Sequence, residues 1–167
     1  MDLGTITAVA VFLFICLILI VIAGRNSRKN EKQFLQAFYD LADKYQCKIS
    51  QYDRWRNTAI GIDENSGKVF FIRKLGEKEI LQYVNLEEIL RCRVISTTRN
   101  VSSKEGKIKV TDKLELAFTC KDKNSPEIYL EFYNADYESL TLRGELQMAE
   151  KWSEIANSRI ASFAPKM

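Results

Sequence analysis

The first feature of the chain is an uninterrupted apolar stretch near its start. From Leu3 to Gly24 no residue is charged, and Val9 to Ile22 consists almost entirely of Val, Phe, Ile and Leu. A helix of about 21 residues, rising ~1.5 Å per residue, reaches roughly the thickness of the hydrocarbon core of a bilayer. The pattern therefore predicts a single membrane-spanning helix, with residues 1–24 as a transmembrane anchor.

A cleaved signal peptide is the alternative for this stretch, since Val21-Ile22-Ala23 offers a small residue near a possible cleavage site. A signal peptide has a basic leader and a hydrophobic run of about 7–15 residues. Here the leader is Met1-Asp2, which has no Lys or Arg, and the run is longer. The uncleaved anchor is the favoured interpretation.

Basic residues flank only one end of the apolar stretch. No Lys or Arg precedes it, whereas Arg25, Arg28, Lys29 and Lys32 follow it. Basic flanks are retained in the cytoplasm. The protein is therefore expected in the plasma (inner) membrane, with its N-terminus outside and the chain after the anchor on the cytoplasmic side. The same four side chains are candidates for contact with the membrane surface.

The next segment has helical periodicity. Asn30 followed by Gln33 resembles a capping box, and apolar residues recur at helical spacing from Phe34 to Tyr45. We expect an amphipathic helix over Glu31–Gln46, so that residues 25–47 form a basic juxtamembrane segment and a helix. Its apolar face could lie on the bilayer, pair with a second copy, or pack on the following domain. The third arrangement is favoured because the helix is joined closely to a globular body. A helix lying on the bilayer would normally carry more Lys and Arg on its polar face.

After Cys47 the period changes from helical to alternating, which indicates strands. A helical turn capped by Asn85 and a final amphipathic helix over Leu142–Ile160, with Trp152 on its apolar stripe, are also expected. The predicted strands cover residues 48–52, 58–63, 68–74, 79–84, 89–99, 107–121 and 127–133.

This order of strands and one terminal helix resembles the pleckstrin-homology-like (PH-like) fold, as found in bacterial membrane-anchored PH-like proteins. The resemblance covers roughly residues 48–160 and rests on the order of the elements. It implies an α+β chain in which residues 48–167 form a mostly antiparallel seven-stranded β-barrel or sandwich closed by a C-terminal helix. The simplest alternative is another small α+β domain with helices on one face of an antiparallel sheet.

Composition narrows the possible functions. The formal net charge is +3. When Arg25, Arg28, Lys29 and Asp2 are left out of the count, the rest of the chain has a net charge of +1. A protein that binds nucleic acids in general is usually more basic than the part of this chain that follows the apolar stretch. The chain has no histidine, which excludes Ser-His-Asp and Cys-His catalysis and zinc sites that need imidazole.

Neither the cysteines nor the carboxylates converge on a reactive site. Cys16, Cys47, Cys92 and Cys120 are widely spaced without a C-x-x-C motif, which indicates reduced thiols. Cys92 lies between two arginines, but on a strand these belong to the opposite face. Acidic pairs such as Glu87-Glu88 are typical of solvated surfaces, and the glycines are scattered. No catalytic, metal or cofactor residues are therefore expected.

Two groups of basic residues are candidates for binding. Possible partner or lipid contacts are Arg99, Lys104, Lys107 and Lys109. The second group would match the headgroup region of PH-like domains and comprises Lys68, Arg73, Lys74 and Lys78. Because Glu64, Glu77 and Glu79 are interleaved with them, a phosphoinositide pocket is disfavoured there. A solvated surface is the alternative for both groups.

These observations favour a non-enzymatic, membrane-tethered binding or scaffolding module at the cytoplasmic face. Its expected partner is another protein or a second copy of the chain, and no nucleic acid, small-molecule substrate or cofactor is expected. The first alternative is a sensor of anionic lipid surfaces. An enzyme with carboxylate chemistry is a disfavoured alternative of another class.

Overall fold

The computed structural model describes residues 14, 16–18, 29–103, 106–138 and 141–163, with the backbone alone at 102, 103 and 106–109. Two compact units, Met1–Asp40 and Leu41–Met167, are formed. Most of the expected anchor over residues 1–24, together with Arg25 and Arg28, lies outside the described residues. Within the described residues, no helix has the length and apolar character needed to span a membrane.

The expected helix over Glu31–Gln46 is confirmed, with helical residues 29–44. It ends in a tight turn, where the Tyr45 and Cys47 amides both donate to the Ala42 carbonyl at 3.0 Å. Gln46, inside that turn, adopts a left-handed φ of 54°. This geometry stops the helix and redirects the chain into the first strands.

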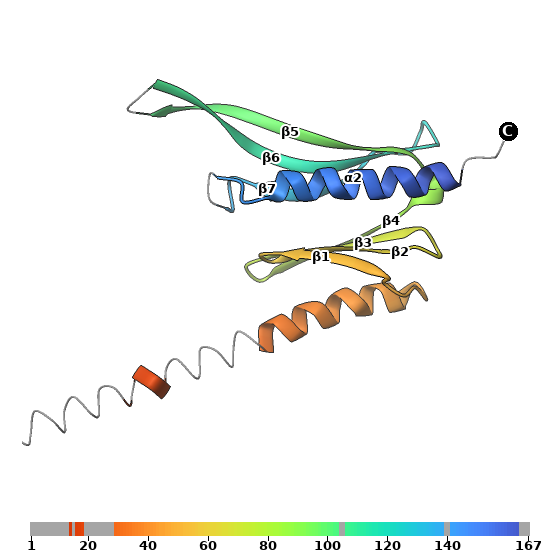
Figure 1. The fold of residues 1–167 in the computed structure, drawn as a ribbon, viewed down its shortest axis with the longest axis horizontal. Helices are drawn as coiled ribbons and strands as arrows, with labels where there is room; N and C mark the ends of the chain where they lie inside the picture. The colour runs from red at the N-terminus through yellow and green to blue at the C-terminus, as the bar shows by residue number, and fades with distance from the viewer. Residues whose placement is uncertain (1–13, 15, 19–28, 104–105, 139–140, 164–167) are drawn as a thin grey trace, which may run out of the picture. The chain divides into compact units, whose positions relative to one another are not determined.

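Four strands form the first antiparallel sheet, in the order β1-β2-β3-β4 (Figure 1). They are β1 (Gln51–Trp55), β2 (Thr58–Asp63), β3 (Lys68–Leu75) and β4 (Lys78–Asn85). The Tyr45 ring contacts Phe70 on β3 and Tyr83 on β4, with ring centroids 6.2 and 4.0 Å apart. In the Leu41–Met167 unit, the residue that follows the helix therefore packs on this sheet.

The second antiparallel sheet has the order β5-β6-β7. A short 3-10 helix, η1 (Leu86–Glu88), precedes it and is capped as expected by the Asn85 side chain, which accepts from the Glu87 amide. The strands are β5 (Ile89–Ser103), β6 (Gly106–Cys120) and β7 (Ile128–Asn134). Because β7 pairs only with residues 113–118 of β6, the distal part of the β5–β6 hairpin extends beyond it (Figure 1).

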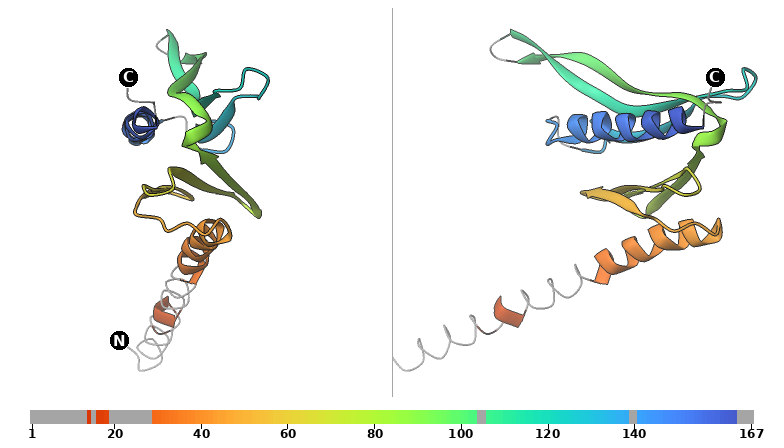
Figure 2. Two further views of the ribbon diagram at one scale, coloured as in Figure 1. Left: turned by 90° about the vertical axis from the view of Figure 1, so that its right-hand side faces the viewer. Right: turned by 45° about the vertical axis from the view of Figure 1, so that its right-hand side comes forward.

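The terminal helix α2 spans Glu145–Ser162 and runs beside the second sheet (Figure 2). It begins three residues later than expected because Gly144 has a left-handed φ of 105°, which a helix cannot include. Trp152 is 1% exposed, and its indole N–H donates to Asp53 on β1 at 2.8 Å. The Asn157 side chain binds both the amide and the carbonyl of Cys92 on β5. Helix α2 is thus attached to both sheets.

The hydrophobic core lies between the inner faces of the two sheets and α2. Its buried members include Ile60 and Phe71 of the first sheet, Leu116 and Phe132 of the second, and Trp152. The expected α+β class, with two antiparallel sheets and a C-terminal helix, is confirmed. The expected barrel is not, since hydrogen-bonded pairing among the described strands stays within each sheet. The chain leaves the first sheet at the end of β4, passes through η1 and enters the second sheet at β5.

Candidate functional site

A pocket of about 710 Å³ opens at one end of the paired sheets. It is formed by the β1–β2 turn, the β3–β4 turn and the segment that follows β7. Its lining residues are Arg56, Asn57, Thr58, Arg73, Lys74, Leu75, Gly76, Lys78, Tyr137 and Glu138. This volume is within the range of ligand pockets in proteins. We refer to it as the Arg73 pocket.

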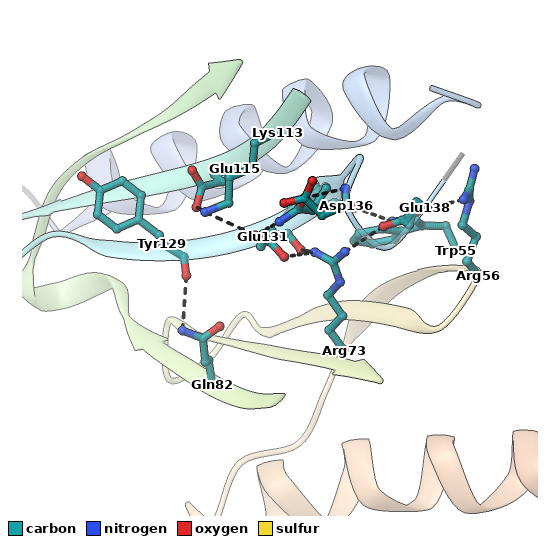
Figure 3. A network of polar contacts seen from close by, with 12 residues as sticks. Trp55, Arg56, Arg73, Gln82, Lys113, Glu115, Tyr129, Glu131, Asp136 and Glu138 are labelled. Atoms are coloured by element: carbon teal, nitrogen blue, oxygen red, sulfur yellow. Dashed lines mark hydrogen bonds and ion pairs between the residues drawn. The ribbon is translucent and has the colours of Figure 1, made fainter. Parts of the chain in front are cut away.

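Arg73 lies at the end of the inward-facing positions of β3. Val69 and Phe71 precede it on that face and belong to the core, whereas Arg73 is 1% exposed. Its guanidinium donates to the Glu131 carboxylate at 2.7 Å and carbonyl at 2.8 Å, and to the Glu138 carboxylate at 2.7 Å (Figure 3). A buried charge is tolerated only when it is paired and hydrogen-bonded in this way. Arg73 therefore connects β3 to β7 and to the segment after it.

A second arginine extends this ion-pair network. Arg56, in the β1–β2 turn, binds Glu138 at 2.9 Å and Glu145 at 3.1 Å. It has a left-handed φ of 46°, a conformation that is strained for a residue with a side chain. Glu145 is the first residue of α2 and is 3% exposed. The turn is thereby held against the start of the helix.

The carboxylates of the network are themselves shared among several partners. Lys113 on β6 binds Glu115 at 2.7 Å and Glu131 at 3.2 Å. Burial raises the pKa of the Glu138 carboxyl, and the guanidinium groups of Arg73 and Arg56 oppose that rise. The acidic groups around Arg73 thus have basic neighbours that compensate their charge.

Side chains from the first sheet also cover backbone groups of β7, an edge strand. Gln82 donates to the Tyr129 carbonyl at 3.2 Å, and Arg73 donates to the Glu131 carbonyl (Figure 3). The Trp55 indole donates to the Phe132 carbonyl at 3.2 Å and stacks on the Phe132 ring. Unpaired edge carbonyls attract other chains, so these contacts protect β7.

The pocket retains polar groups that the network does not use. Among the described residues, the side chains of Asn57, Lys74 and Lys78 have no hydrogen-bond or ion-pair partner. Tyr137, also in the lining, is 65% exposed. In the strand register Lys78 shares the face of Arg73, whereas Lys74 is on the opposite face. The site can therefore offer one amide, the ammonium group of Lys78 and an aromatic ring to a ligand.

Of the basic candidates from the sequence, Arg73, Lys74 and Lys78 are among the lining residues of this pocket. The other candidates are the expected membrane-surface residues and the Arg99–Lys109 group. Lys29 and Lys32 are exposed on the helical residues 29–44, and Arg99 on β5 is paired with Asp112 at 3.0 Å. Lys107 and Lys109 belong to β6, where only the backbone is described, and Lys104 is outside the described residues. Of the described side chains in these groups, those of Lys29, Lys32 and Arg99 do not line the Arg73 pocket.

Sequence reasoning missed most of the pocket. It considered Arg73, Lys74 and Lys78 but not Arg56, Asn57, Tyr137 or Glu138 as parts of one site. One local signal was present, because an arginine continues the inward alternation of Val69 and Phe71. Such a position requires buried acceptors from another part of the chain.

The cysteines are all free, and Cys47 and Cys92 are buried. Burial raises the pKa of the Cys92 thiol to about 12. The neighbouring Arg93 is on the opposite face, where it binds Glu127 at 2.6 Å. Cys92 therefore lacks the thiolate character of a nucleophile. Among the described residues, no three His, Cys, Asp or Glu side chains are grouped to hold a metal ion.

Comparisons of the chain with protein-family models, with curated proteins and with solved structures gave no match.

Proposed function

We propose that the chain is a non-enzymatic binding module that captures a protein partner through the Arg73 pocket. The observation that carries this proposal is that the arginines of the pocket are ion-paired within the protein, whereas Lys78 is not. Arg56 and Arg73 are occupied by Glu131, Glu138 and Glu145, so they build the pocket. The side chains without such pairing, Asn57 and Lys78, remain for recognition.

The chemistry of the pocket supports binding rather than catalysis. A carboxylate that acts as a general acid or base must reach a proton on the substrate. Glu138 is instead held by Arg73 at 2.7 Å and by Arg56 at 2.9 Å. Groups that stabilise one another in this manner favour a rigid recognition surface.

We further propose that the module is PH-like and is tethered to the cytoplasmic face of the plasma membrane by the apolar residues 3–23. The strand order of four plus three, followed by one helix, supports the first part. The one-sided basic flank supports the second part. A tether raises the effective concentration of the module for partners at the membrane.

Site-specific photocrosslinking of the full-length chain in native membranes tests the binding function. A photoreactive phenylalanine analogue replaces Tyr137 in the pocket, and in a matched chain it replaces Lys123, which is exposed in the turn before β7. We expect a discrete protein adduct from position 137 and none from position 123. Either the same adducts from both positions or no adduct from position 137 would contradict the proposal.

The tether is tested separately with a reporter fused after Met167. Because basic residues follow the apolar stretch, the reporter should be active in the cytoplasm and protected from external protease. Activity only on the outside would reverse the proposed orientation. A mature chain that begins near Gly24 would show cleavage of the anchor.

A further inference from the structure

We infer that the Arg73 pocket recognises a single carboxylate on an apolar body, presented as an acidic side chain in a peptide segment of the protein partner. This inference rests on the proposed binding function and adds the chemistry of the partner. Its evidence is the placement of Lys78, the occupancy of the two arginines, and the apolar part of the lining.

Lys78 is the cation available on the pocket side of the β3–β4 hairpin. In the strand register Lys78 lies opposite Leu75, and Ile80 lies opposite Arg73, so these four residues share one face. Lys74 lies opposite Glu79 on the other face. The acidic neighbour Glu79 therefore faces away from the pocket. This separation is not evident from the sequence, where basic and acidic residues alternate.

The number of available charges favours a carboxylate over a phosphate. Phosphate recognition typically uses the planar fork of an arginine, with two parallel hydrogen bonds. Both arginines of the pocket are already bound to carboxylates, at distances between 2.7 and 3.1 Å. A phosphate monoester, which carries close to two charges, would meet only lysine ammonium groups there. A ligand with one negative charge matches Lys78 better.

The remaining lining suits a peptide side chain with apolar neighbours. Leu75 is half-buried, and the Tyr137 ring is 65% exposed. Gly76, in the turn between the strands, and Lys78 are both exposed, and there is open space where a side chain at Gly76 would begin. The Asn57 amide can donate to a second carboxylate oxygen or to a peptide carbonyl. The ligand carboxylate would therefore contact Lys78 while its apolar neighbours contact Leu75 and Tyr137.

The test uses NMR of the full-length protein in nanodiscs of zwitterionic phosphatidylcholine. The probes are the peptide acetyl-Leu-Glu-Phe-amide and its uncharged analogue acetyl-Leu-Gln-Phe-amide. We expect the acidic peptide to shift the amide signals of Asn57, Gly76 and Lys78 at millimolar concentration, and the analogue to bind about fivefold more weakly. The substitution Lys78→Gln should remove this difference. The matched substitution Lys123→Gln, at an exposed lysine outside the pocket, should leave it unchanged.

Several outcomes overturn the inference. Equal binding of the two peptides, or no shift by either at about 10 mM, excludes recognition of the carboxylate. Equal effects of Lys78→Gln and Lys123→Gln indicate non-specific attraction. If inorganic phosphate, or vesicles containing phosphatidylglycerol, bind more tightly than the acidic peptide, the ligand of the pocket is a phosphate-bearing molecule and the inference is wrong.

Failure of this inference is distinguishable from failure of the proposed function. If position 137 still crosslinks a protein in the Lys78→Gln chain at the original level, the binding module is retained and the carboxylate is rejected. If the acidic peptide binds through Lys78 but position 137 yields no adduct in membranes, the inference that the pocket binds a carboxylate is retained. The proposed capture of a protein partner is then rejected.

Discussion

Replacement of Arg73 by methionine is the sharpest test of the network that builds the pocket. The guanidinium is 1% exposed and has three short contacts, to the Glu131 carboxylate and carbonyl and to the Glu138 carboxylate. Methionine fills much of the same volume but leaves two partly buried carboxylates without that partner. Removal of one member of a buried ion pair typically costs about 3–5 kcal/mol.

The remaining contacts place the expected loss at the lower end of this range. Glu131 keeps Lys113 at 3.2 Å and the Asn134 amide at 3.0 Å, and Glu138 keeps Arg56 at 2.9 Å. We therefore expect Arg73→Met to lower the free energy of unfolding by about 3 kcal/mol. Adding Glu138→Gln to this variant should recover about 1–2 kcal/mol, because the partly buried Glu138 carboxylate has by then lost one of its two arginine partners.

Urea unfolding of the full-length protein in detergent, followed by tryptophan fluorescence, measures these free energies. The exposed substitution Lys123→Met is the control and should change stability by less than about 0.5 kcal/mol. A loss of less than about 1 kcal/mol for Arg73→Met would show that the ion pairs are not needed to hold β3 and β7 together. A double variant less stable than Arg73→Met would refute the charge argument.

Three further predictions concern other parts of the fold. Trp152→Ala should cost about 3–5 kcal/mol in urea unfolding, because it empties the core at α2; a change within about 0.5 kcal/mol would exclude that role. Gly67 and Gly76 both have φ near +60°, but only at Gly67 would an added Cβ clash with the Phe163 ring. Gly67→Ala should therefore lower the melting temperature more than Gly76→Ala, and equal effects would contradict the contact. Hydrogen bonds from Arg93, Thr119 and Tyr129 lower the pKa of Glu127 to about 2. Its stabilising effect should be present above the ordinary pKa of 4.5 and be lost as the pH falls from there through about 2. Carboxyl NMR titration should show that pKa rising in Arg93→Gln, and an unchanged value would exclude the pairing.

Local patterns predicted most of the secondary structure. The strand Thr58–Asp63 was expected with the bounds that the structure has, and Asn85 caps η1 as expected. The first strand was expected at residues 48–52 but β1 is Gln51–Trp55. The Lys48 amide instead donates to the Asp63 side chain at 2.9 Å, a contact across 15 residues that no local pattern contains.

The candidate site was much less predictable. Lys78 and Glu79 are adjacent in sequence, and they appeared to cancel one another's charge. The strand register places them on opposite faces, so that only Lys78 shares the face of Arg73. The acidic partners of Arg73 are 58 and 65 residues away along the chain. Pairing over such separations depends on how the two sheets are packed.

By itself, the sequence determined the order and type of the elements. Hydrophobic periods of two and 3.6 residues, and the capping residue Asn85, depend on neighbouring positions. It also predicted the apolar anchor over residues 1–24, which stays a prediction. Tertiary structure alone decided that the sheets remain separate, that Arg73 is buried and paired, and that Arg56 and Glu138 meet in one pocket. The physical reason is that a buried charge is stable only where distant carboxylates reach it, and this depends on the packing of the whole unit rather than on any local segment.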